Sequence, residues 1–123
     1  MDNEINALFN KALETLEDSK IAINNERYNM SMNRSYYATF YGAKALLLKK
    51  GIITKTHSGT IHQFGLEYVV KGNFNGEIAK IFSELEDYRE DADYDSFFSA
   101  TEEDSRENLE NAEIFIEECR KFL

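Results

Sequence analysis

The chain has 123 residues, a formal net charge of −9, 42% hydrophobic residues and no proline. A chain of this length is expected to form one domain, 1–123, with enough buried apolar surface to need no disulfide or metal cross-link. The negative charge argues against broad non-specific binding to DNA, because such binding depends on Lys and Arg that neutralise phosphates. A local basic cleft for RNA and a basic protein partner both stay open.

The cysteine content and the N-terminal segment bear on location. Cys119 is the only cysteine, so no intramolecular disulfide can form, and this usage is typical of a reducing cytosol. The segment MDNEINALFNKALE is amphipathic and acidic, so we expect neither a signal peptide nor a membrane-spanning helix there. We therefore expect a cytoplasmic protein.

Apolar residues at steps of three and four predict a first helix from about Asp2 to Asn24. A second helix is predicted from Arg27 or Tyr28 to Lys50, because a glycine then occupies the usual C-terminal stop position. Asparagines between the two helices favour a turn.

The second helix carries two stripes on neighbouring faces. The aromatic and aliphatic stripe consists of Tyr37, Phe40, Tyr41, Lys44, Leu47 and Leu48. The small-residue stripe, which would let another helix approach closely, consists of Ser35, Ala38, Gly42 and Ala45. A helix that is apolar or small over so much of its circumference is expected at the centre of a bundle.

Three further helices complete the predicted fold. The third spans about residues 58–71 and begins with Thr56 or Ser58 as its cap. The fourth spans about residues 75–94, and the fifth begins at Thr101, which starts a sequence resembling a capping box. No segment shows sustained two-residue alternation, so the sequence predicts an all-α, up-and-down bundle of four to five helices.

The histidines do not form a recognisable metal motif. His57 and His62 are five residues apart, whereas a zinc pair on one helical face usually has i, i+4 spacing and an acidic third ligand. There is also no Gly-rich phosphate loop and no nucleophile elbow. We expect no metal site and no cofactor.

Two groups of polar residues are the candidates for a binding site, NRSYYATFY at 33–41 and REDADY at 89–94. Arg34 falls among positions predicted to be buried, where an unpaired charge is costly. Arg89 and Asp93 are one helical turn apart and could pair. These charges form either a structural network between the second and fourth helices or a polar cleft that binds a ligand. The residues of such a cleft would be Asn33, Arg34, Tyr37 and Asp93.

Three segments in order resemble the HEPN superfamily: NRSYYATFYGAKALLLKKGI, KTHSGTIHQFGLEYVVKG and REDADYD. The resemblance is closest to a branch of small prokaryotic proteins and covers about residues 27–105. It implies a helical bundle that is usually a homodimer and is encoded beside a minimal nucleotidyltransferase. Many HEPN proteins are metal-independent RNases that act as toxins in toxin–antitoxin, CRISPR-associated and other defence systems.

The RNase signature of that family is an arginine, four to six residues and a histidine, brought together across the dimer. Its nearest counterpart here runs from Arg89 to Tyr94, with tyrosine in place of histidine. A tyrosine with an ordinary pKa of about 10 is a poor general base near neutrality. His57 could replace the missing base. In related systems the nucleotidyltransferase attaches AMP to a tyrosine near the signature, which makes Tyr94 the candidate for modification.

We interpret the chain as a HEPN-type partner of a minimal nucleotidyltransferase in a toxin–antitoxin or related defence or stress system, with nucleotide or RNA binding and catalysis left open. One alternative is an active metal-independent ribonuclease toxin that uses Arg89 with Tyr94 or His57. Another alternative is a purely structural helical adaptor. The surplus of aromatic and small residues on the second helix suits a two-fold interface, so we expect a homodimer.

Overall fold

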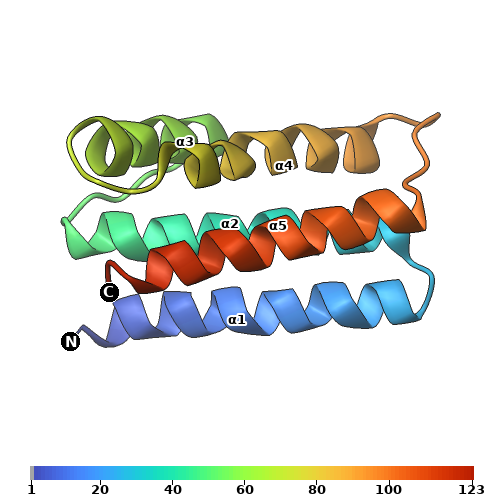
Figure 1. Ribbon diagram of the computed structural model, residues 1–123, viewed down its shortest axis with the longest axis horizontal. Helices are drawn as coiled ribbons and strands as arrows, with labels where there is room; N and C mark the ends of the chain where they lie inside the picture. The colour runs from blue at the N-terminus through green and yellow to red at the C-terminus, as the bar shows by residue number, and fades with distance from the viewer. Residues whose placement is uncertain (1) are drawn as a thin grey trace.

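The computed structural model describes residues 2–123, and none of them lies in a β-strand. The elements in chain order are α1 (Asn3–Asn24), α2 (Tyr28–Lys49), α3 (His57–Phe64), a π-helix η1 (Gly65–Val70), α4 (Gly76–Tyr94) and α5 (Glu102–Arg120). Successive long helices run in opposite directions (Figure 1). The prediction of an all-α, up-and-down bundle is confirmed.

Helix α2 lies at the centre of the bundle, where it contacts α1, α3, α4 and α5. Figure 1 shows α1 on one side of α2, and α3 and α4 on the other. The N-terminus and the loop after α2 lie at one end of the bundle, while the loop between α4 and α5 lies at the opposite end. The two ends therefore carry different loops. No helix among residues 2–123 has the length and apolar composition needed to cross a membrane.

Most helices begin near the residues predicted from the sequence, because side-chain caps mark these positions. Thr56, not Ser58, caps α3, because its Oγ1 accepts the backbone N–H of Gly59 at 2.9 Å. Thr101 caps α5 in the same way, accepting the N–H of Asp104 at 3.1 Å. Such caps satisfy backbone donors that have no partner within the helix.

The prediction of one regular third helix over residues 58–71 is wrong. The α-helix ends at Phe64 and continues as the π-helix η1, in which the N–H of Lys71 bonds the carbonyl of Leu66 at 3.0 Å. Phe64 and Tyr68 are both buried in the core, where their rings stack with centroids 5.6 Å apart. The phenol of Tyr68 also donates to the carbonyl of Leu46. Single π turns of this kind occur as insertions within α-helices.

The small-residue stripe of α2 is buried in contacts inside the bundle. Ser35 bonds Ser19 of α1 through their hydroxyls at 2.8 Å. Gly42 lets α5 approach so closely that a Cβ there would lie 2.7 Å from Cδ1 of Ile116. The aromatic stripe differs, because all its members except Leu47 stay half-exposed on the surface. Of the two stripes, only the aromatic one is exposed enough to contact another molecule.

Candidate functional site

A buried guanidinium lies at the centre of the polar network between α2 and α4. Arg89 is 5% exposed, and its Nε donates to Oε1 of Glu86 at 2.6 Å, while its Nη1 donates to Oδ2 of Asp93 at 3.2 Å. Burial alone would lower the pKa of Arg89, but the hydrogen bond and charge of Glu86 outweigh it and raise that pKa. The arginine is therefore permanently charged, and its charge is already matched by two carboxylates.

His57, the first residue of α3, joins this network from the side. Its Nδ1 lies 2.8 Å from the hydroxyl of Tyr36 and 3.9 Å from Oε2 of Glu86, and its Nε2 lies 3.4 Å from the hydroxyl of Tyr37. The imidazole stays partly open to solvent. The carboxylate of Glu86 thus lies next to both His57 and Arg89. The sequence alone did not show whether His57 lies near Arg89.

Tyr36 connects the histidine to the arginine. It is fully buried, its ring lies 5.2 Å from Cζ of Arg89, and it stacks on Phe82. Burial, together with the nearby carboxylate of Glu86, raises the pKa of the phenol. The phenol therefore stays protonated and can donate to His57, which would leave the second imidazole nitrogen as the donor.

The predicted cleft residues lie at the outer edge of this network. Asn33 donates to Oδ2 of Asp93 at 3.0 Å and accepts from Nη2 of Arg34 at 2.7 Å. Arg34 also lies 5.1 Å from the ring centroid of Tyr37 and forms no ion pair with any of residues 2–123. Its expected charge partner is thus replaced by an amide and an aromatic face. Arg34 is half-exposed, whereas Arg89 is buried.

Tyr94 stands apart from the other candidate residues. It is the last residue of α4, its side chain is 77% exposed, and its ring centroid lies 5.8 Å from Cζ of Arg89. A phenol in this position is accessible to a second protein.

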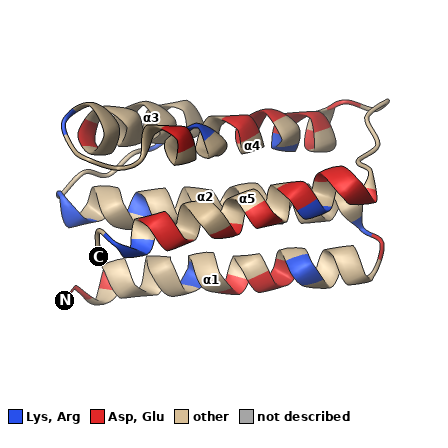
Figure 2. Cartoon of the chain, in the orientation of Figure 1, with Lys and Arg blue, Asp and Glu red and all other residues tan. Residues whose placement is uncertain are grey.

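Two members of the network were missed at the level of sequence, Tyr36 and Glu86. Glu86 precedes Arg89 by three residues, which is a helical pairing distance, but the acidic composition of α4 hides it among other carboxylates (Figure 2). Tyr36 lies between positions assigned to the two stripes. The spacing from Asn33, which places both residues near one helical face, was the available signal.

Comparison with known proteins gives a consistent family. A family model described as HEPN domain matches residues 5–122. A UPF0332 protein of Thermotoga maritima is 35% identical over 113 residues, which cover 92% of this chain and 86% of the relative. "Putative toxin MJ0605" of Methanocaldococcus jannaschii is 38% identical over 120 residues, covering 98% of this chain and 89% of the relative.

The fold has a solved counterpart. The crystal structure of TT1696 from Thermus thermophilus superposes with a TM-score of 0.86, covering 99% of this chain and 100% of that chain, at 16% sequence identity. This likeness concerns the fold alone. The family match extends over nearly all of the chain and includes Arg89, His57 and Tyr94. The chain therefore belongs to the HEPN domain family.

Proposed function

We propose that this protein is the toxin-like HEPN member of a cytoplasmic toxin–antitoxin or related defence pair, and that it partners a minimal nucleotidyltransferase. Two relatives from Methanocaldococcus jannaschii, 35% and 38% identical, are named "Putative toxin". Binding of the partner, of a nucleotide or of RNA is its main activity in this proposal. Cleavage of RNA by the standard HEPN signature is not its main activity in this proposal.

The pairing of Arg89 with two carboxylates is the observation that supports this proposal. An arginine that stabilises a phosphate during RNA cleavage has to present its charge to the substrate. Here two carboxylates lie within hydrogen-bonding distance of the guanidinium, so Glu86, Arg89 and Asp93 together carry a net negative charge. A phosphate would have to displace a carboxylate and would be repelled by the other.

Tyr94 supports the role of the nucleotidyltransferase. Its phenol projects from the end of α4, next to the arginine that marks the family signature. Transfer of AMP from ATP to this oxygen, with pyrophosphate as the leaving group, would modify an exposed residue five positions after Arg89. We propose Tyr94 as the modified residue.

The partnership is tested by co-expression with a minimal nucleotidyltransferase, followed by affinity purification and intact-mass measurement. We expect co-purification and a mass increase of one or more AMP groups in the wild type, lost in Tyr94→Phe. Tyr88→Phe is the matched control, because Tyr88 lies on the same helix and is also exposed. Failure to co-purify would reject the partnership, while an unmodified wild-type protein with an active partner would reject only the role of Tyr94.

A second candidate function, an active ribonuclease, is favoured by His57. A histidine with a carboxylate at 3.9 Å and an arginine beyond it has the components of a general base and a phosphate ligand. Single-stranded RNA incubated with wild type, His57→Ala and Arg89→Ala decides this question, with His62→Ala as the matched control. Cleavage that both site variants abolish and the control retains would establish the ribonuclease. RNA left uncut by the wild type would dismiss it.

The homodimer is part of the proposal. The aromatic stripe of α2 stays half-exposed, although His57 of α3 and Lys11 of α1 pack against parts of it. An apolar stripe of this kind on a central helix suits a two-fold interface, in which the same patch of each copy covers the other.

A further inference from the structure

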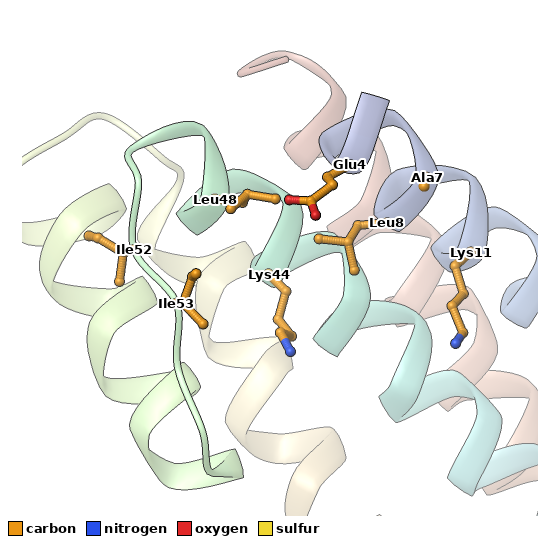
Figure 3. A pocket seen from close by; sticks show the side chains of 8 residues that line it. All are labelled: Glu4, Ala7, Leu8, Lys11, Lys44, Leu48, Ile52 and Ile53. Atoms are coloured by element: carbon orange, nitrogen blue, oxygen red, sulfur yellow. The ribbon is translucent and has the colours of Figure 1, made fainter. Parts of the chain in front are cut away.

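A groove of about 370 Å³ lies between the start of α1 and the end of α2, in the size range of sites that bind small molecules. We call it the α1–α2 groove, and its apolar wall consists of Ala7, Leu8, Leu48, Ile52 and Ile53. Figure 3 shows Leu8 on α1 facing Leu48 on α2, while Ile52 and Ile53 come from the loop that follows α2. A ligand in this groove would therefore contact two helices and a loop.

The apolar wall leaves surface uncovered on its loop side. Ile53 is 77% exposed, whereas Leu8, Leu48 and Ile52 pack partly against the core. Removing apolar surface from water is favourable in proportion to the area removed. An apolar ligand body that lies against Ile53 would gain this free energy.

The rim of the groove carries two lysines, Lys11 and Lys44. Their ammonium groups lie over aromatic rings, 4.9 Å from the centroid of Tyr41 and 5.3 Å from that of Phe40. Among residues 2–123 neither lysine forms an ion pair, although the chain has a net charge of −9. The rings hold both ammonium groups at the rim without neutralising them, so an anion can pair with them there.

The charges of the groove are arranged by sign. Helix α2 contains no Asp or Glu, and the acidic residue that lines the groove, Glu4, comes from the first turn of α1. Figure 3 shows the ammonium group of Lys44 pointing away from the carboxylate of Glu4. An anionic head group is therefore attracted to the part of the rim with the lysines and repelled from the part with Glu4.

The length of the groove suits a small molecule better than a peptide helix. Its α1 side runs from Glu4 to Lys11, about 10 Å at the rise of an α-helix. A bound helix usually makes contacts over more turns than this, since short helices are unstable alone. Small-ligand sites instead combine a mostly apolar wall with a few polar groups that orient the ligand, as this groove does.

We propose that the α1–α2 groove binds a medium-chain carboxylate, with its aliphatic chain along the apolar wall and its carboxylate at the rim formed by Lys11 and Lys44. An uncharged apolar molecule would leave both ammonium groups without a counter-charge, and inorganic phosphate would leave the apolar wall uncovered. A head group with one negative charge is favoured over a polyanion, because the chain itself is strongly negative.

This site lies away from the network around Arg89. Asn33, which bonds Asp93, is about 16 Å from Lys44 along the axis of α2. Lys44 and Leu48 also belong to the aromatic stripe of α2, so the ligand would lie at one end of that stripe. The proposal does not depend on the nucleotidyltransferase, and its failure would leave that partnership intact.

Isothermal titration calorimetry of the full chain with decanoate, below the concentration at which it forms micelles, tests the site. We expect one decanoate per chain, with an affinity that rises about twofold to fourfold for each methylene added from hexanoate to decanoate. Decanol, which lacks the charge, and acetate, which lacks the chain, should each bind at least about tenfold more weakly. Equal affinity for decanoate and decanol would overturn the role of the lysines and with it the proposal.

Charge variants test the rim. Lys11→Met with Lys44→Met should lower the affinity for decanoate at least about tenfold, while Lys11→Arg with Lys44→Arg should keep most of it. Lys71→Met with Lys80→Met is the matched control, because it removes two exposed lysines that lie elsewhere. Equal losses in the two Met variants would reduce the effect to net charge and overturn the proposal.

A blocking variant tests the apolar wall without touching the core. Ala7 is exposed and lines the groove, so Ala7→Phe should fill the groove and abolish binding of decanoate in a folded protein. Asn10→Phe, at another exposed position of α1, is the matched control and should bind like wild type. Circular dichroism and thermal unfolding check that both variants fold.

Two further outcomes would overturn the proposal. Decanoate that binds Ala7→Phe as tightly as wild type would place the binding outside the groove. A wild type that binds no decanoate, but whose residues 4–11 are protected from hydrogen exchange by a co-purified nucleotidyltransferase, would assign the groove to that partner.

Discussion

The hydroxyl of Tyr36 lies 2.8 Å from Nδ1 of His57, although the two residues belong to different helices and are separated by 21 positions. This contact orients the histidine at the start of α3 against the central helix. It also places the imidazole next to Glu86 and thereby next to Arg89. The arrangement of the site therefore depends on one buried phenol.

Tyr36→Phe should lower the free energy of unfolding by about 1 kcal/mol, because the hydrogen bond to His57 is lost while the ring stays packed. Urea denaturation followed by circular dichroism measures this change. Tyr41→Phe is the control, since no hydrogen bond of its hydroxyl is found among residues 2–123. Equal stability of both variants would show that the contact with His57 contributes nothing.

Arg89→Ala should destabilise the fold by about 3–5 kcal/mol, because it leaves the buried carboxylate of Glu86 without its cation. The double variant Arg89→Leu with Glu86→Leu removes both charges and should recover much of that loss. Thermal unfolding of the three proteins provides the comparison. A double variant less stable than Arg89→Ala would contradict the assigned cause.

The stability contributed by Glu118 should depend on pH. Lys121, 2.9 Å away, and the backbone N–H of Asn75 hold the pKa of Glu118 below its ordinary value, even though burial opposes this. A carboxyl group with a lowered folded-state pKa stabilises the protein above its unfolded-state pKa and loses this effect as the pH falls through the folded-state value. The deficit of Glu118→Gln should therefore be present at neutral pH and shrink below about pH 4.

Denaturant unfolding of Glu118→Gln and wild type across pH 3–7 measures this dependence. Glu117→Gln is the matched control, because Glu117 is the exposed neighbour on the same helix. A deficit that stays constant over the whole range would rule out ionisation of Glu118 as its cause.

Gly42→Ala should be coupled to Ile116→Val. The added Cβ would meet Cδ1 of Ile116 at 2.7 Å, and overpacking of this kind costs about 1–3 kcal/mol, against a gain in helix propensity of about 1 kcal/mol. Shortening Ile116 removes the atom that clashes. A double-mutant cycle should therefore show a favourable coupling energy, and additive effects would place the two residues out of contact.

The helices could be predicted from sequence because their apolar spacing and caps are local signals, as Thr101 illustrates. The half-exposed face of α2 and the position of Glu86 could not, because they depend on which helices pack together. Phe74 shows the same limit: it lies between the predicted third and fourth helices, yet it is buried and packs edge-on against Phe64, with ring centroids 4.9 Å apart. Residues of the candidate site were found through resemblance and charge pattern, whereas their contacts required the fold.

The π-helix η1 has a consequence for how the chain tolerates changes in length. A π turn accommodates one residue more than an α turn, and the surplus is stored between Gly65 and Val70, directly before the connection to α4. Deleting one residue there would convert the segment to a regular α-helix with little shift of the flanking helices. The bundle should thus tolerate the loss of one residue within η1, which lies away from Arg89 and His57.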